Sequence, residues 1–322
     1  MKVRQFANGC EVSQALEVRD VELRRRDGTE FLFVLLGDRT GSVPAVLWDG
    51  IADARELCRL GEVVHASGRF WAHPRFGGQL ELGIVRRALE GEYEPAELSG
   101  GPARAPEQME ADLRQLIATV HNAHLRRLLG SLFGEGSATW TVYRNAPAAK
   151  HYHQAYRHGL LEHSLTVAQA VSAISATFPG IDRDVAVSGA LLHDIGKLEA
   201  YEVDGELISM SDRGRLYGEI SLGYYRVRRA IERLDGFPRE LEQAVLHIIL
   251  SHHGSLEYGS PVVPCTREAT LVHMIDNLGS RLGSFDRLEQ ELPAGEQWSV
   301  YDKALGSGAY FAHRARPRRE AA

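Results

Sequence analysis

The sequence predicts a two-domain protein in which an all-β domain is followed by an all-α domain. Its 322 residues are about twice the ~150 residues of a typical domain, so each part is long enough to bury its own core. Apolar residues alternate or form short runs up to residue 92, and they recur at helical spacing from residue 109. The stretch 93–108 is rich in Gly, Pro and Glu, which indicates a linker. The composition, 44% hydrophobic and 25% charged, excludes a disordered or fibrous chain.

Five short strands are expected in residues 1–92. They are 16–23, 30–36, 42–49, 62–71 and 79–89, with a helix at 51–60 between the third and the fourth. An Asp-Gly pair at 27–28 is typical of the hairpin turn between the first two strands. Five strands with one helix after the third is the order of an OB-fold barrel. We therefore expect residues 1–92 to be an OB-fold domain that binds nucleic acid.

Helices are expected throughout residues 109–312. Leu113, Leu116, Ile117 and Val120 repeat on one helical face. Further helices are expected at 157–178, 184–193, 219–234, 239–252 and 268–282, and a basic tail at 313–322. No window approaches ~18 consecutive apolar residues, and the first residues lack a secretory apolar stretch. We therefore expect a cytoplasmic protein with no membrane partner.

Histidines gather in the helical part of the chain, where nine of the fourteen lie between residues 151 and 273. Four short motifs lie at or near the ends of apolar helical runs: His163, His193-Asp194, His252-His253 and Asp276. Imidazole and carboxylate together suit borderline divalent metals such as Mn, Fe, Co and Zn. Two such ions ~3.5–4 Å apart can activate water and clamp an in-line phosphoryl displacement. A lone His-Asp pair is usually structural, but the four motifs together predict a metal centre.

These motifs resemble those of a known enzyme family. His163, His193-Asp194 and Asp276 match the H…HD…D pattern of the HD-domain metal-dependent phosphohydrolases. The segments AAKHYHQAYRHGLLEHS, GALLHDIGKLEAY, LSHHGSLEYGSPVVP and EATLVHMIDNLGSRL resemble the YhaM family of 3′→5′ exoribonucleases. This resemblance implies an OB-fold followed by a helical HD domain. It also implies that His163, His193, Asp194 and Asp276 form a first metal site.

The resemblance further implies a second ion that Asp194 bridges to the first. Residues from the middle of the domain would hold it, including His252, His253 or both. The family normally offers a histidine in a Gly-His-Ile segment, where this sequence has Gly218-Glu219-Ile220. Since a carboxylate is a competent ligand, we expect Glu219 to substitute for it. The occupancy of the second site is left open by this change.

Three further residues are candidates for catalysis or substrate contact. Lys197, one of four lysines in the chain, is expected to stabilise charge on the phosphoryl oxygens, with a helix-dipole role as the alternative. His153 and Tyr156 are candidates for substrate contact, with packing as an equal alternative. His247 and His273 lie on apolar helices and are expected to be core residues.

The expected OB-fold is not strongly basic, because residues 1–92 hold 13 basic and 14 acidic residues. Strand binding would therefore depend on local arginine and aromatic contacts. The candidates are Trp48, Arg69, Trp71, Arg75 and Phe76. Phe31 and Phe33 are expected to belong to the barrel core instead.

The expected function is metal-dependent 3′→5′ exonuclease activity on single-stranded RNA, with DNA left open, that releases 5′-mononucleotides. One alternative is an HD phosphohydrolase of a small or cyclic nucleotide with a regulatory OB domain. A second is a nucleic-acid-binding protein with a decayed HD site. Two divalent ions are the expected cofactors, with Mn first and Fe, Co, Mg or Zn as alternatives. A homo-oligomer is also expected.

Overall fold

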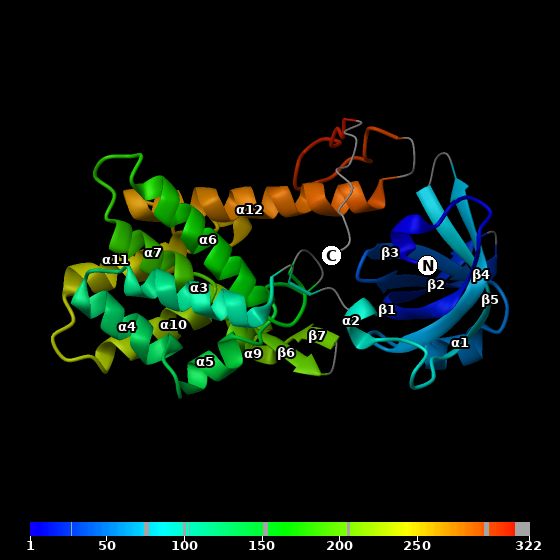
Figure 1. The fold of residues 1–322 in the computed structure, drawn as a ribbon, viewed down its shortest axis with the longest axis horizontal. Coiled ribbons are helices and arrows are strands. Elements are labelled where there is room, and N and C mark those ends of the chain that lie inside the picture. Colours follow the sequence, from blue (N-terminus) through cyan, green and yellow to red (C-terminus); the bar gives the residue numbers. More distant parts are fainter. Residues whose placement is uncertain are drawn as a thin grey trace. The chain divides into compact units, whose positions relative to one another are not determined.

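The computed structural model describes residues 1–26, 28–73, 77–98, 101–102, 104–150, 154–204, 207–292 and 296–312 (Figure 1). Arg75, Phe76, His153 and the basic tail at 313–322 lie outside the described residues. The chain divides into two compact units, Met1–Ser99 with Arg281–Ala322 and Gly100–Ser280, and each has its own hydrophobic core. No helix among the described residues is long and apolar enough to cross a membrane.

A closed five-stranded barrel forms the core of the first unit. Its strands are β1 (Glu11–Arg26), β2 (Thr29–Asp38), β3 (Gly41–Leu47), β4 (Val63–His73) and β5 (Gly77–Arg87), and α1 (Ile51–Leu57) lies between β3 and β4 in sequence. The strand order is β1-β2-β3-β5-β4, and the antiparallel pairing of β1 with β4 closes the barrel. Among the strands that the structure describes, only β3 and β5 pair in parallel. This arrangement confirms the predicted OB-like barrel.

Strand β2 shows why the barrel exposes aromatic rings. Leu32, Val34 and Leu36 are fully buried, whereas Phe31 and Phe33 are only partly buried. Successive side chains of a strand point to opposite faces, so the two phenylalanines lie on the outer face. The expectation that both belong to the barrel core is therefore wrong, because the continuous apolar run concealed the alternation.

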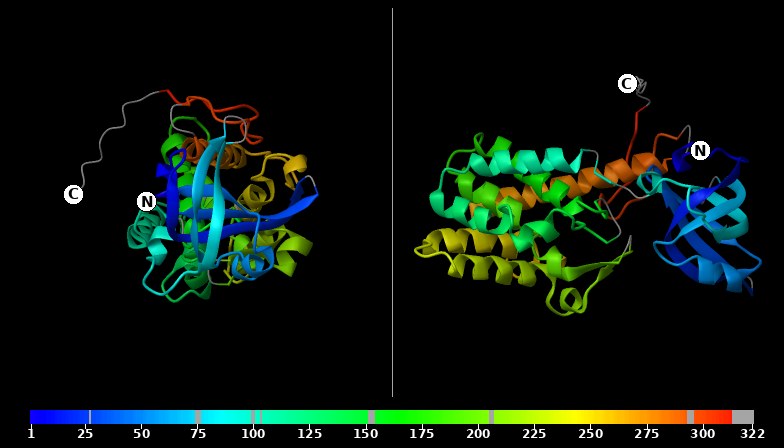
Figure 2. Two further views of the ribbon diagram at one scale, coloured as in Figure 1. Left: turned by 90° about the vertical axis from the view of Figure 1, so that its right-hand side faces the viewer. Right: turned by 60° about the horizontal axis from the view of Figure 1, so that its bottom comes forward.

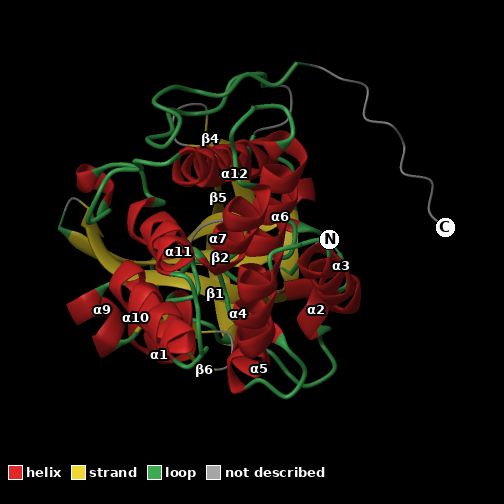
Figure 3. Cartoon of the chain, turned by 90° about the vertical axis from the view of Figure 1, so that its left-hand side faces the viewer, coloured by secondary structure: helices red, strands yellow, loops and turns green. Residues whose placement is uncertain are grey.

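The second unit is helical. Its helices are α3 (Pro106–Ala118), α4 (Ala123–Phe133), α5 (Ala138–Tyr143), α6 (Gly159–Ser175), α7 (Arg183–Leu192), α8 (Lys197–Ala200), α9 (Asp212–Tyr217), α10 (Glu219–Glu232), α11 (Arg239–Ser251) and the first part of α12 (Arg267–Glu291). Helix α12 continues unbroken over 25 residues (Figure 2). Helices α10 and α11 pack side by side (Figure 3).

Several short elements were not expected from the sequence. A two-stranded hairpin of β6 (Tyr201–Asp204) and β7 (Leu207–Met210) interrupts the helical unit. The expected linker at 93–108 contains α2 (Pro95–Leu98) and the first residues of α3. Short 3-10 helices cover Val3–Gln5 and Leu256–Tyr258.

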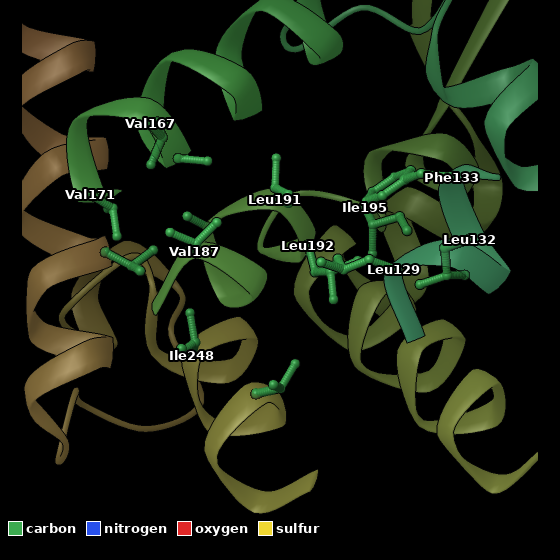
Figure 4. Close-up of a cluster of buried hydrophobic side chains, with 14 of the residues drawn as sticks. Leu129, Leu132, Phe133, Val167, Val171, Val187, Leu191, Leu192, Ile195 and Ile248 are labelled. Atoms are coloured by element: carbon green, nitrogen blue, oxygen red, sulfur yellow. The ribbon is translucent and has the colours of Figure 1, made fainter. Parts of the chain in front are cut away.

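Helix α7 is the centre of the helical core. Every residue from Val185 to Leu192 is buried, so the helix is covered on all sides. Side chains from α4, α6 and α11 surround it, among them Ile248 (Figure 4). A Cβ at Gly189 would overlap the side chain of Ile248, so α11 approaches the backbone of α7 closely. Because α7 is held so tightly, the residues that follow it have a fixed position.

Truncation of Leu191 tests this central position. Leu191 is fully buried, and Leu191→Ala is expected to lower the free energy of unfolding by about 2–5 kcal/mol through reduced apolar burial and a cavity. Urea denaturation followed by circular dichroism measures the change. Leu256→Ala is the matched control, since Leu256 is 64% exposed. An equal loss of stability in both variants would contradict the central role of α7.

Candidate metal centre

Two helix ends present imidazoles in the same way. His193 is the C-cap residue of α7, and His252 is the C-cap residue of α11. The Nδ1 of His193 donates to the Ala190 carbonyl at 2.7 Å, and the Nδ1 of His252 donates to the Ile249 carbonyl at 2.7 Å. Each bond satisfies a carbonyl that the helix end leaves unpaired. Each also fixes the tautomer, so Nε2 is left with a lone pair for a ligand.

A first group of ligand atoms forms where α6, the end of α7 and α12 meet. The Nε2 of His163 lies 3.1 Å from Nε2 of His193 and 3.2 Å from Oδ2 of Asp194. It also lies 3.2 Å from Oδ1 of Asp276. The His163, His193 and Asp194 side chains are buried, and their ligand atoms all lie within 4.8 Å of one another. Two imidazole nitrogens and two carboxylate oxygens thus converge, which is a suitable set for a divalent transition-metal ion.

A second group begins at the other oxygen of Asp194. Oδ1 of Asp194 lies 3.5 Å from Nε2 of His252, and the ring of His252 lies next to that of His253, with centroids 4.4 Å apart. Nε2 of His253 lies 3.5 Å from Oε1 of Glu219, while its Nδ1 donates to the Tyr258 carbonyl at 2.8 Å.

One atom of this second group shows that the residues fit a metal ion. Nε2 of His252 is buried and has no hydrogen-bond partner among the described residues. Leaving such an atom unpaired costs about 1–3 kcal/mol. A ligand held against Asp194, His253 and Glu219 removes that cost, and the first group fits an ion through its donor set alone.

Neighbouring positive charge and hydrogen bonds compensate the burial of the carboxylates in this centre. Burial acts to raise the pKa of Asp194, but Lys197, His193 and His163 hold it well below its usual range. The Nζ of Lys197 lies 2.7 Å from Oδ2 of Asp194. Burial acts to lower the pKa of His163, but its hydrogen bonds to Asp194 and Asp276 outweigh this and raise it to about 9. An ion that binds here replaces the proton of His163, as expected for a metal ligand.

Glycine in the HDIG turn brings Glu219 to the centre. A Cβ at Gly196 would overlap the carbonyl oxygen of Glu219 and lie 2.5 Å from the backbone nitrogen of Gly223. The backbone of α10 therefore rests directly on the turn that follows His193 and Asp194. Because α10 begins at Glu219, this contact fixes the position of that carboxylate.

The structure reveals two supporting residues that the sequence analysis missed. His273 is only partly buried, and its Nδ1 donates to the His252 carbonyl at 2.8 Å. It lies one turn before Asp276 on α12, so one helix supports both groups. The amide of Gln154 lies on the far side of His163, with Oε1 3.1 Å from Nδ1. The three-residue spacing of His273 and Asp276 was a signal for the first, but no sequence signal marked Gln154.

The remaining candidates that the structure describes are Tyr156 in the helical unit and Trp48, Arg69 and Trp71 in the barrel unit. Tyr156 is partly buried, and its hydroxyl donates to Glu162. In the barrel unit, Trp48 is 36% exposed and Trp71 is 44% exposed. The guanidinium of Arg69 lies 5.8 Å from the ring centre of Trp71.

Aromatic and arginine pairs on the outer face of the barrel were not predicted as such. The ring of Phe31 packs against Trp48 with centroids 4.7 Å apart. The guanidinium of Arg24 lies 3.6 Å from the ring centre of Phe33. Strict alternation along β2 was the signal that could have identified them.

Comparisons with known proteins agree with this geometry. The family model for the HD domain matches residues 160–280, which include every residue of both groups. The chain is 30% identical over 285 residues to the 3′-5′ exoribonuclease YhaM of Shouchella clausii (strain KSM-K16), covering 87% of this chain and 86% of that protein.

Two solved structures are among those to which the chain is similar. The second OB-fold domain of replication protein A from Methanococcus maripaludis covers 28% of this chain and 98% of its own, at 22% identity and a TM-score of 0.23. The second single-stranded DNA binding protein (SSBb) of Mycobacterium smegmatis covers 26% of this chain and 89% of its own, at 15% identity and a TM-score of 0.21. From the near full-length match to the Shouchella protein and the HD match across the site, the chain belongs to the YhaM family of 3′-5′ exoribonucleases.

Proposed function

We propose that the protein is a metal-dependent 3′→5′ exonuclease that hydrolyses single-stranded RNA to 5′-mononucleotides, with DNA as a second substrate to compare. The single observation that carries this proposal is the position of Asp194. Its Oδ2 faces His163 and His193, and its Oδ1 faces His252. A carboxylate that faces both groups can bridge two ions, and a pair of ions is the arrangement that two-metal phosphodiester cleavage uses.

The two groups of side chains would hold one ion each. His163, His193, Asp194 and Asp276 would hold the first, and Asp194, Glu219, His252 and His253 the second. When bound, the two ions supply Lewis acidity and positive charge to an in-line displacement at phosphorus. The mixed nitrogen and oxygen donors favour Mn, with Fe, Co, Mg and Zn as ions to compare.

Lys197 has a separate role in this proposal. Its side chain is largely buried beside Asp194, and that carboxylate raises its pKa against the opposing effect of burial. Lys197 therefore stays an ammonium group and keeps Asp194 ionised. The same positive charge stabilises negative charge that develops on the phosphoryl oxygens.

The barrel would hold the strand. Three pairs of side chains on its surface have the arginine and aromatic character of single-strand binding surfaces: Arg24 with Phe33, Phe31 with Trp48, and Arg69 with Trp71. Their rings and guanidinium groups are partly or fully exposed, so bases and phosphates can reach them.

The proposal extends to location and assembly. We propose a cytoplasmic location, because Cys10, Cys58 and Cys265 are all unpaired, which is usual in the reducing cytoplasm.

A homo-oligomer stays a prediction, and sedimentation velocity would measure the mass of the assembly. An exposed apolar stripe on α12 supports self-association: Met274, Leu278, Leu282 and Phe285.

Blocked oligonucleotides test the proposed activity. With Mn²⁺, 5′-labelled RNA is expected to shorten from its 3′ end, and a 3′-terminal block is expected to stop it. Gel electrophoresis and chromatography of the products measure this, with DNA and a 5′-blocked strand as comparisons. Degradation that ignores the 3′ block would contradict the proposal. Faster turnover of free or cyclic nucleotides would favour a small-substrate phosphohydrolase.

Removal of the shared carboxylate tests the two-ion arrangement. Asp194→Asn is expected to lower RNA hydrolysis by at least about 10²–10³-fold, the scale of losing one charge-stabilising group. Bound metal, measured by mass spectrometry, is expected to fall in parallel. Because the variant leaves the buried ammonium of Lys197 unpaired, Asp194→Asn with Lys197→Met is the folding control. Full metal content and activity in the double variant would refute a shared ligand.

Glu219 tests the second group by itself. Glu219→Gln is expected to reduce the metal content from about two ions per chain to about one. The substitution removes a carboxylate that belongs to the second group alone, whereas Asp194 belongs to both groups. Glu219→His keeps a ligand at this position and is expected to restore the second ion. Glu232→Gln, on the exposed end of the same helix, is the matched control. Two bound ions in Glu219→Gln would show that this carboxylate is not a ligand.

A further inference from the structure

The surface of α9 and α10 carries large side chains that the core does not use. A hollow of about 490 Å³ is lined by Arg213, Leu216, Tyr217, Ser221, Leu222 and Tyr225. Leu216 is 75% exposed, Tyr217 is 58% exposed and Tyr225 is 52% exposed. Exposed apolar and aromatic side chains that gather around one hollow typically mark a binding surface. We call this region the α9–α10 surface (Figure 3).

The α9–α10 surface is basic in a protein that is acidic overall. Residues 212–233 hold six arginines and three acidic residues, while the whole chain has a net charge of −6. Three of the six form ion pairs: Arg213 and Arg226 with Glu199, and Arg228 with Glu232 and Glu242. The guanidinium of Arg229 lies 5.6 Å from the ring centre of Tyr225. Arg215 is exposed and donates only to the Met210 carbonyl, at 3.3 Å. Neither arginine has an acidic partner within the described part of the chain, so both are free to meet an anion.

This surface begins beside the candidate metal centre. Helix α9 ends at Tyr217 and α10 begins at Glu219, so Gly218 alone separates them. Gly218 has φ 73, a conformation that glycine adopts without strain and that lets the chain turn sharply there. Two residues span at most about 7 Å of chain, so the Cα atoms of Tyr217 and Glu219 are close. The carboxylate of Glu219 faces His253, while the ring of Tyr217 is exposed.

We propose that the α9–α10 surface binds the nucleotides of the single-stranded substrate that lie next to the scissile bond. Tyr217 and Tyr225 stack against bases, and Arg215 and Arg229 contact phosphates. The proposal rests on the exonuclease function proposed above and assigns part of strand binding to the helical unit itself.

The chemistry of the surface favours a nucleic-acid strand over a protein. Tyrosine and arginine are also enriched at protein interfaces. There, the tyrosine rings lie in an apolar core from which most charged groups are excluded. Here, unpaired positive charge lies beside the aromatic rings and next to a centre suited to phosphodiester cleavage. Stacking on an aromatic ring accepts every base, which suits an enzyme that must advance along any sequence.

Binding without cleavage tests the aromatic part. Full-length protein is freed of divalent ions, and the anisotropy of a labelled single-stranded RNA is measured. Tyr217→Leu with Tyr225→Leu is expected to weaken binding by roughly 5- to 150-fold for each ring that stacks. Phe178→Leu is the matched control, since Phe178 is 57% exposed in the turn between α6 and α7. Unchanged affinity of the double variant would overturn the proposal.

The salt dependence of the same binding tests the arginines. Arg215→Gln with Arg229→Gln is expected to flatten the plot of log affinity against log salt by roughly 0.7 for each phosphate that the variant no longer neutralises. Arg126→Gln removes an exposed arginine from α4 and is expected to leave the slope unchanged. Identical slopes for the parent protein and both variants would contradict phosphate binding at this surface.

A small substrate separates this proposal from the proposed function. Hydrolysis of bis(p-nitrophenyl) phosphate needs the metal centre but cannot span the hollow, so the tyrosine variant is expected to keep that activity while kcat/KM for RNA falls. If the parent protein cleaves no RNA, the proposed function fails, yet the metal-free binding still tests the surface. Should the variants change the molecular mass by light scattering and leave RNA affinity intact, the surface is a protein interface and the inference is wrong.

Discussion

The buried carboxylate of Asp194 is the constraint on which the rest of the helical unit depends. A carboxylate withdrawn from water costs several kcal/mol unless it is paired and hydrogen-bonded. Lys197 lies one helical turn ahead at 2.7 Å, and His163 and His193 lie within 3.4 Å. These groups keep the pKa of Asp194 low, so the carboxylate is ionised. The position of Asp194 in turn depends on α7, because every side of that helix is packed.

Helix ends and close backbone contacts convert this packing into ligand geometry. His193 and His252 each bond to a carbonyl three residues earlier, so each ring is oriented by the helix it caps. The absence of a side chain at Gly196 lets α10 start against the turn that carries Asp194. The distances between ligands that lie far apart in sequence therefore depend on a few close contacts between helix backbones. A shift of one helix would separate the two groups.

Periodicity and motif spacing in the sequence predicted the order of the barrel strands and four of the candidate metal ligands. The barrel order followed from short strands around one helix, and His163, His193, Asp194 and Asp276 followed from their match to the H…HD…D pattern. The spacing of residues in the sequence could not reveal the contact between Gln154 and His163. Gln154 has a φ of 62, a left-handed conformation that a helical or strand periodicity does not record. The outward position of the Phe31 and Phe33 rings was missed because every residue of this run is apolar. In such a run, the sequence of a strand buried on one face cannot be told from that of a strand buried on both faces.

The substitution at Glu219 makes the two proposed sites chemically alike. Each would have two imidazoles and two carboxylates, with Asp194 common to both, whereas a histidine at residue 219 would give the second site three imidazoles. The added negative charge would shift the proposed second site toward harder ions such as Mn²⁺ and Mg²⁺. The side chains of Glu219 and His253 are 23% and 29% exposed, against 20% for Asp276, 10% for His163 and 0% for His193 in the first group. The second ion would therefore lie closer to solvent than the first, and substrate would meet it first. Glu219 also adjoins the arginine-rich α9–α10 surface. The positive charge that attracts a polyanionic strand would therefore lie beside this second ion.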